Sequence, residues 1–297
     1  MWWMPVIIGI ISIVALLAIT VLVLLFINKL NKKASICSLI VLLLILGILL
    51  PILICYQSYD VTYLEEGVKT FLWFFIPVLV LTIILIPIRI FVKIPDFIYR
   101  KILHITAIGM TSVLVIIPTH WWISEIVLLI CSLGIIFVLI IFETTKFYKE
   151  LFIEKGNHEV LISITLFFLV IASLIAFFFG FRGDNNKYYV IIALAAWGLG
   201  DAFASIIGHL FGKHKVSGKF IEGIKSIEGT IACFIFSFII SFILLILLMH
   251  SIWWLALLES LVIGIAVSFI ELFTKKGLDN ITCPIAAAVI LFLFSLF

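Results

Sequence analysis

The stretch Trp197–Ala232, WGLGDAFASIIGHLFGKHKVSGKFIEGIKSIEGTIA, decides how this chain folds. An apolar segment containing Asp201 leads through a loop rich in lysine and glycine into a second apolar segment. A carboxylate at membrane depth is costly, so it indicates a buried partner or a function. The loop suits phosphate, because lysines attract the anion and glycines let backbone N–H groups approach it. The stretch therefore predicts two membrane helices joined by an anion-binding loop.

The rest of the chain is equally apolar. Of its 297 residues 65% are hydrophobic and 12% are charged, which excludes an ordinary soluble domain. Since a span needs about 20 residues, the apolar runs predict an all-α, polytopic membrane bundle of about ten helices with no soluble domain. The expected spans are 5–28, 35–55, 70–92, 102–117, 121–142, 158–181, 188–210, 227–249, 252–273 and 281–297.

Positive charge alternates between the loops. Sixteen of the nineteen lysine and arginine residues lie in or beside the odd-numbered loops, and the exceptions are Lys69, Arg182 and Lys187. The positive-inside rule therefore predicts cytoplasmic odd-numbered loops and both termini on the outside. The five cysteines form neither a CxxC pair nor a cluster with histidine, so no metal site or disulfide is expected from them.

Polar residues cluster at the predicted cytoplasmic ends of the spans. Arg100, Lys101 and His104 share one helical face, where they indicate either a phosphate clamp or an ordinary positive anchor. Glu271 precedes Asp279 and Asn280 at the start of the last span. That second cluster is typical of a turn with an ion pair to Lys275, or of metal-binding carboxylates.

Within the opening stretch, spacing places the polar groups on shared faces. Asp201, Ser205, His209 and Lys213 are four residues apart and predict one polar stripe. The small residues Gly200, Ala204 and Gly208 form a neighbouring stripe suited to close helix packing, so Asp201 is expected to face protein. Ser226 is placed to cap the following helix, whose N-terminus would favour an anion.

A nucleotide-binding P-loop is excluded. The segment Gly218–Ser226 approaches the Walker pattern, but Ile224 stands before Lys225, and a membrane helix replaces the β-strand that should precede it. Taken together, the carboxylates, cations and glycines at one membrane face are nevertheless the set that phosphoryl transfer requires, with Mg²⁺ held by acidic groups. A membrane enzyme with such a site is expected to act on a lipid.

Four motifs in order resemble the CTP-dependent polyprenol, phytol and dolichol kinases, a family of lipid alcohol kinases. The resemblance covers roughly residues 95–290, within an expected kinase core of 66–297 that follows an appendage of two helices at 1–65. The motifs are Arg100-Lys101-x-x-His104; Gly200-Asp201-Ala202-x-Ala204 with Gly208 and Gly212-Lys213; Lys225-Ser226-x-Glu228-Gly229; and Glu271 with Gly277-Leu278-Asp279-Asn280 and Pro284.

The resemblance implies transfer of the γ-phosphate of CTP to a lipid alcohol, giving a lipid monophosphate and CDP. It implies Asp201, His104 and Asp279 as catalytic residues, with the general base either Asp201 or His104, and Asp201, Asp279 and Glu271 as Mg²⁺ ligands. The nucleotide and its phosphates would be bound by Arg100, Lys101, Gly212, Lys213, Lys225, Ser226, Glu228, Gly229 and Asn280. The expected partners are the bilayer, the lipid alcohol and CTP, and not nucleic acid.

Two other functions fit the same charges. A cytidylyltransferase acting on phosphatidate would use a similar site, but its C-terminal pattern of clustered Asp and Arg is not found. An ion-coupled transporter would place polar groups near the bilayer midplane and show related halves, and neither feature is found. Glu125 and Glu259 lie near predicted outer ends and are interpreted as interfacial residues.

Overall fold

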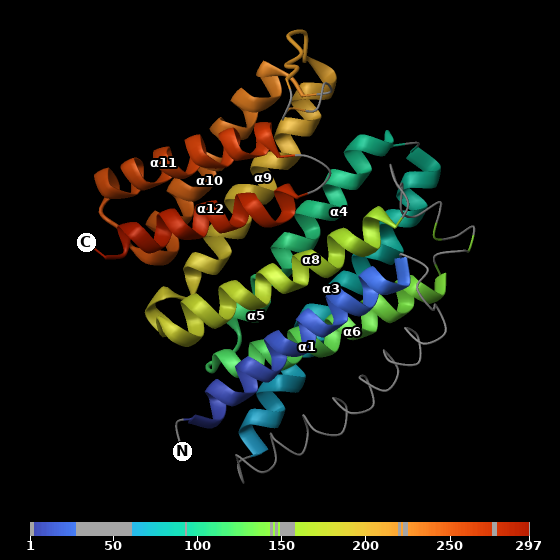
Figure 1. Cartoon of the computed structure of the whole chain (residues 1–297), viewed down its shortest axis with the longest axis vertical. Helices are drawn as coiled ribbons and strands as arrows, with labels where there is room; N and C mark the ends of the chain where they lie inside the picture. The colour runs from blue at the N-terminus through green and yellow to red at the C-terminus, as the bar shows by residue number, and fades with distance from the viewer. Residues whose placement is uncertain are drawn as a thin grey trace. The chain divides into compact units, whose positions relative to one another are not determined.

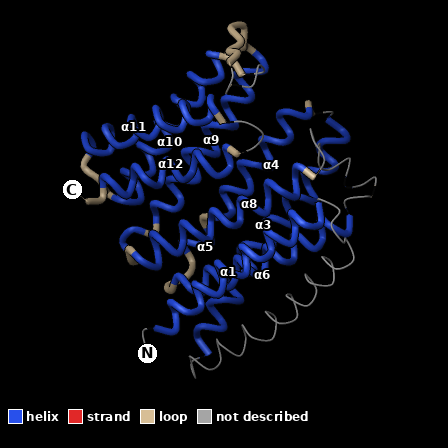
Figure 2. Tube along the Cα trace, viewed as in Figure 1, coloured by secondary structure: helices blue, strands red, loops and turns tan. Residues whose placement is uncertain are grey.

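The computed structural model describes residues 3–27, 61–92, 94–142, 145, 148, 158–218, 221, 225–274 and 278–296. These residues are helical almost throughout, and among them there is no strand beyond isolated bridges at Lys215–Ser226 and Gly218–Ile221 (Figures 1 and 2). Seven of the described helices are long and apolar enough to cross a membrane. The predicted all-α membrane bundle is thereby confirmed, and the chain is a multi-pass membrane protein.

The helices follow the expected spans closely, except that the span expected at 35–55 lies outside the described residues. They are α1 (Trp3–Ile27), α3 (Val61–Val92), α4 (Asp96–Thr111), α5 (Val113–Ile116), α6 (Trp121–Phe142), α8 (Glu159–Leu174) with its π-helical continuation η1 (Ile175–Phe181), the 3₁₀ turn η2 (Asp184–Asn186), α9 (Tyr188–Leu210), α10 (Ile227–Met249), α11 (Trp253–Phe273) and α12 (Asp279–Phe294).

Two helices begin earlier than hydropathy predicts. α3 starts at Val61 rather than at 70, and α4 starts at Asp96 rather than at 102. Glu65 and Glu66 interrupt the apolar run on which the expected start was based, but glutamate is a good helix former and does not end a helix. Pro95 sits at the N-cap of α4, where its missing N–H is no loss. The early start places Lys101 and His104 inside a regular helix.

The described helices fall into two compact units. Unit 1 comprises residues 1–81 and 113–183, and unit 2 comprises residues 82–112 and 184–297. In unit 1, α1 packs on α6 and α8, and the ring of Trp121 lies against both Gly9 and Gly180. The expected boundary between residues 65 and 66 falls within α3. The chain passes between the two compact units after residues 81, 112 and 183.

Unit 2 is organised around α9, which packs on α4, α10, α11 and α12 (Figure 1). The predicted small-residue stripe makes the contact with α10: Gly200 faces Ser237 and Cys233, and Gly208 faces Gly229. Ser237 Oγ also donates to the Ala196 carbonyl across this contact at 2.7 Å. The close approach turns Asp201, next to Gly200, away from lipid and into protein, where it is 8% exposed.

We expect Gly200→Val to destabilise the protein by about 1–3 kcal/mol, the usual cost of overpacking. A Cβ at this position would lie 2.2 Å from Ser237 Oγ and 3.1 Å from Cys233 Sγ, so α9 and α10 would have to separate. The measurement is the thermal midpoint in detergent. Gly109→Val on α4 is the control, because nothing lies within 4 Å of its Cβ position. Equal midpoints for the two variants would contradict the packing argument.

Candidate active site

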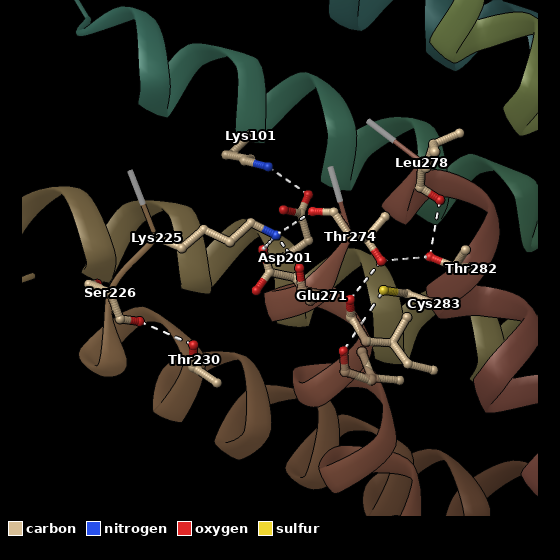
Figure 3. A network of polar contacts seen from close by, with 12 residues as sticks. Lys101, Asp201, Lys225, Ser226, Thr230, Glu271, Thr274, Leu278, Thr282 and Cys283 are labelled. Atoms are coloured by element: carbon tan, nitrogen blue, oxygen red, sulfur yellow. Dashed lines mark hydrogen bonds and ion pairs between the residues drawn. The ribbon is translucent and has the colours of Figure 1, made fainter. Parts of the chain in front are cut away.

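Asp201 forms a buried ion pair with a lysine that is one hundred residues earlier in the chain. Lys101 Nζ donates to Asp201 Oδ2 at 2.6 Å (Figure 3). His104 Nε2 lies 3.7 Å from the same oxygen. The antiparallel pairing of α4 with α9 produces this contact, since Lys101 and His104 are i, i+3 on the face of α4 toward α9. The His104 ring also meets Trp197 edge-on, with centroids 4.7 Å apart.

A second buried ion pair joins the loop before α10 to the end of α11. Lys225 Nζ lies 3.0 Å from Glu271 Oε1, and it also donates to the backbone carbonyls of Glu271 and Thr274 (Figure 3). Carbonyls in the last turn of a helix lack partners, and a lysine can satisfy them. Lys225, for which the resemblance implied phosphate binding, thus caps the C-terminus of α11 in this structure.

Asp279 stands in the first turn of α12, and its side chain makes no hydrogen bond or ion pair to another described residue. It interacts electrostatically with Asp201, Lys101, Glu271 and Lys225. Three carboxylates and two lysines from α4, α9, α11, α12 and the loop before α10 therefore form one charged cluster. The expected convergence of these sequence motifs is found within unit 2.

The loop between α9 and α10 is held by its own polar groups. Ser226 Oγ accepts from Gly229 N at 3.2 Å, which confirms the predicted cap of α10. Glu228 accepts from the backbone N–H of His214 and contacts its Nδ1 at 2.7 Å. Ser226 and Glu228 are therefore engaged in shaping the loop, and the backbone of Lys213 also hydrogen-bonds to the Glu228 carboxylate, whereas Lys213 itself is exposed.

The remaining expected site residues lie outside the two buried ion pairs. Gly212 and Gly229 are required by packing, because a Cβ would lie 2.2 Å from the Gly208 carbonyl and 2.9 Å from the Ala204 carbonyl respectively. Arg100 is half-buried and acts electrostatically on His104, and Asn280 is half-buried in the first turn of α12. The predicted polar stripe on α9 ends at His209, because the helix ends at Leu210 and Lys213 lies beyond it.

Two carboxylates interpreted as interfacial are buried instead. Glu125 on α6 is 0% exposed and Glu259 on α11 is 3% exposed. Their positions near helix ends suggested an interface, but both side chains are covered by protein. The sequence motifs gave no role to Phe97, although it stands four residues before Lys101 and so shares its face, and its ring contacts His209.

The carboxylates suit a magnesium ion that the substrate helps to bind. Among the described residues no three groups of His, Cys, Asp or Glu are close enough to hold a metal by themselves. Magnesium usually takes only one or two protein carboxylates and completes its shell with water and phosphate oxygens. Asp279, which has no ion pair in the described part of the chain, together with Glu271 or Asp201, fits that pattern.

No protein-family model, no curated protein and no solved structure matches this chain.

Proposed function

We propose that this protein is a membrane-embedded kinase that transfers the γ-phosphate of CTP to a lipid alcohol. The observation that carries the proposal is the buried pairing of Asp201 with Lys101, within reach of Lys225, Glu271 and Asp279. Phosphoryl transfer needs cations for the phosphates and a group that accepts the proton of the attacking hydroxyl. The cluster contains both kinds of group among apolar helices that a lipid tail can lie against.

Asp201 is the residue we assign as the proton acceptor. Lys101 and His104 both approach Oδ2, which leaves Oδ1 without a hydrogen bond among the described residues. The alcohol oxygen would attack the γ-phosphorus while its proton passes to Oδ1. The bond from the γ-phosphorus to the bridging oxygen breaks, and CDP leaves with that oxygen and its electron pair.

Cationic side chains would hold the phosphates during this step. Lys101 is the cation we assign to the terminal phosphates, and Arg100 reinforces the positive charge. Magnesium, when bound with the nucleotide, neutralises charge on the transferring group. Asp279 and Glu271 are the residues we assign to hold it. By the positive-inside rule this end of unit 2 faces the cytoplasm and both termini lie outside.

The test uses purified protein in detergent with γ-labelled CTP, Mg²⁺ and a panel of phytol, farnesol, geranylgeraniol, long polyprenols and diacylglycerol. We expect label in the monophosphate of at least one alcohol. If no alcohol is labelled and phosphatidate instead releases pyrophosphate from CTP, the protein is a cytidylyltransferase. Failure of both reactions would refute a nucleotide-dependent lipid enzyme and favour ion-coupled transport.

A further inference from the structure

An aromatic pair joins α4 to α9 beyond the charged cluster. The rings of Phe97, in the first turn of α4, and His209, in the last turn of α9, have centroids 4.0 Å apart and planes tilted by 34°. Both helices belong to unit 2. His209 is exposed and Phe97 is half-buried, so the pair offers an open aromatic surface.

This surface lies in line with the Asp201–Lys101 pair. Asp201, Ser205 and His209 are successive i, i+4 positions of α9, and the eight residues from Asp201 to His209 advance about 12 Å along the helix. On the facing helix, Phe97 precedes Lys101 by four residues. A nucleoside triphosphate whose terminal phosphate reaches Lys101 would, when extended along these faces, bring its base to the aromatic pair.

We propose that Phe97 and His209 form the platform on which the nucleotide base stacks. This inference rests on the proposed function, and it adds where the base binds and by what force. Stacking on aromatic side chains uses the π-face that every base has, so the platform provides affinity without choosing between bases. Phe97 and His209 are thus binding residues for the nucleoside, while the charged cluster binds its phosphates.

The test compares binding of CTP with binding of inorganic triphosphate, which lacks the base. Equilibrium dialysis with purified full-length protein in detergent measures both. We expect wild-type protein to bind CTP more tightly than triphosphate. In Phe97→Leu/His209→Leu, CTP binding should weaken about 5- to 150-fold, as for loss of a base-stacking contact, while triphosphate binding stays unchanged.

Two controls separate stacking from packing. Phe203→Leu removes a different ring contact of α9, in which the Phe203 and Phe236 ring centroids are 3.6 Å apart, and should leave both affinities unchanged. His209→Phe keeps an aromatic ring and should retain CTP binding. The inference is overturned if the double variant binds CTP as wild type does, or if it loses triphosphate binding equally. It also falls if wild-type protein binds triphosphate as tightly as CTP, whereas no binding of either ligand refutes the proposed function itself.

Discussion

Asp201→Asn is expected to lower the rate of phosphate transfer by about 10²–10⁴-fold, the contribution of a positioned general base. Asparagine has nearly the same volume as aspartate, so the packing of α9 against α4 and α10 is preserved. What is lost is the oxygen that takes the proton of the attacking alcohol. The measurement is the single-turnover rate with γ-labelled CTP and the alcohol that the panel identifies.

A matched control comes from the other end of the same helical unit. Asp184 also pairs with a lysine, Lys187, at 2.9 Å, but its side chain is 66% exposed (the Asp201 side chain is 11%). Asp184→Asn should leave the transfer rate unchanged, because an exposed ion pair is worth little. The assignment fails if Asp201→Asn transfers phosphate at the wild-type rate.

Lost activity must also be separated from lost folding. Asp201→Asn leaves the Lys101 ammonium without its partner in a buried site, which is itself destabilising. Asp201→Leu/Lys101→Met removes both charges, and replacement of a whole buried pair by apolar groups of similar volume is often neutral for stability. We expect this double variant to match the wild-type thermal midpoint and to remain inactive. Activity in a double variant that folds would exclude Asp201 as the base.

Hydropathy predicted the helices of this chain well, because a membrane span can be recognised from its own run of residues alone. Runs of about 20 apolar residues need no knowledge of what they pack against. The early start of α4 at Asp96 could not be predicted in this way, because Asp96, Arg100 and Lys101 lower the hydropathy of its first six residues. The same limitation applies to Glu125 and Glu259, because their burial depends on how other parts of the protein pack against them.

The site was predicted as a set of motifs, but the pairs within it were not. Spacing placed Asp201 on a protein-facing stripe beside Gly200, and the packing on Ser237 and Cys233 confirms that placement. No sequence pattern indicated that Lys101 would reach Asp201, since the two residues are one hundred positions apart. The contacts of Lys225 could not be predicted either, because only the fold brings the C-terminal end of α11 and its free carbonyls next to this lysine.

Lys225→Met is expected to lower the free energy of unfolding by about 3–5 kcal/mol, because it leaves the Glu271 carboxylate buried and unpaired. It also removes the donor that satisfies the Glu271 and Thr274 carbonyls at the end of α11. The segment after Thr274 leads to Asp279, so we expect magnesium-dependent transfer to fall as well. Unfolding by a denaturing detergent, followed by circular dichroism, measures the first effect.

Variants at Glu271 separate the ion pair from the helix cap. Glu271→Gln leaves Lys225 its two carbonyls, so the expected loss is smaller, about 1.5–3 kcal/mol for one hydrogen bond to a charged group. The charge swap Lys225→Glu/Glu271→Lys restores opposite charges but directs a carboxylate at carbonyl oxygens and at the negative end of the α11 dipole. We therefore expect the swap to be less stable than Lys225→Met/Glu271→Gln, which has neither charge. A swapped protein as stable as wild type would mean that the ion pair alone matters and that Lys225 does not cap α11.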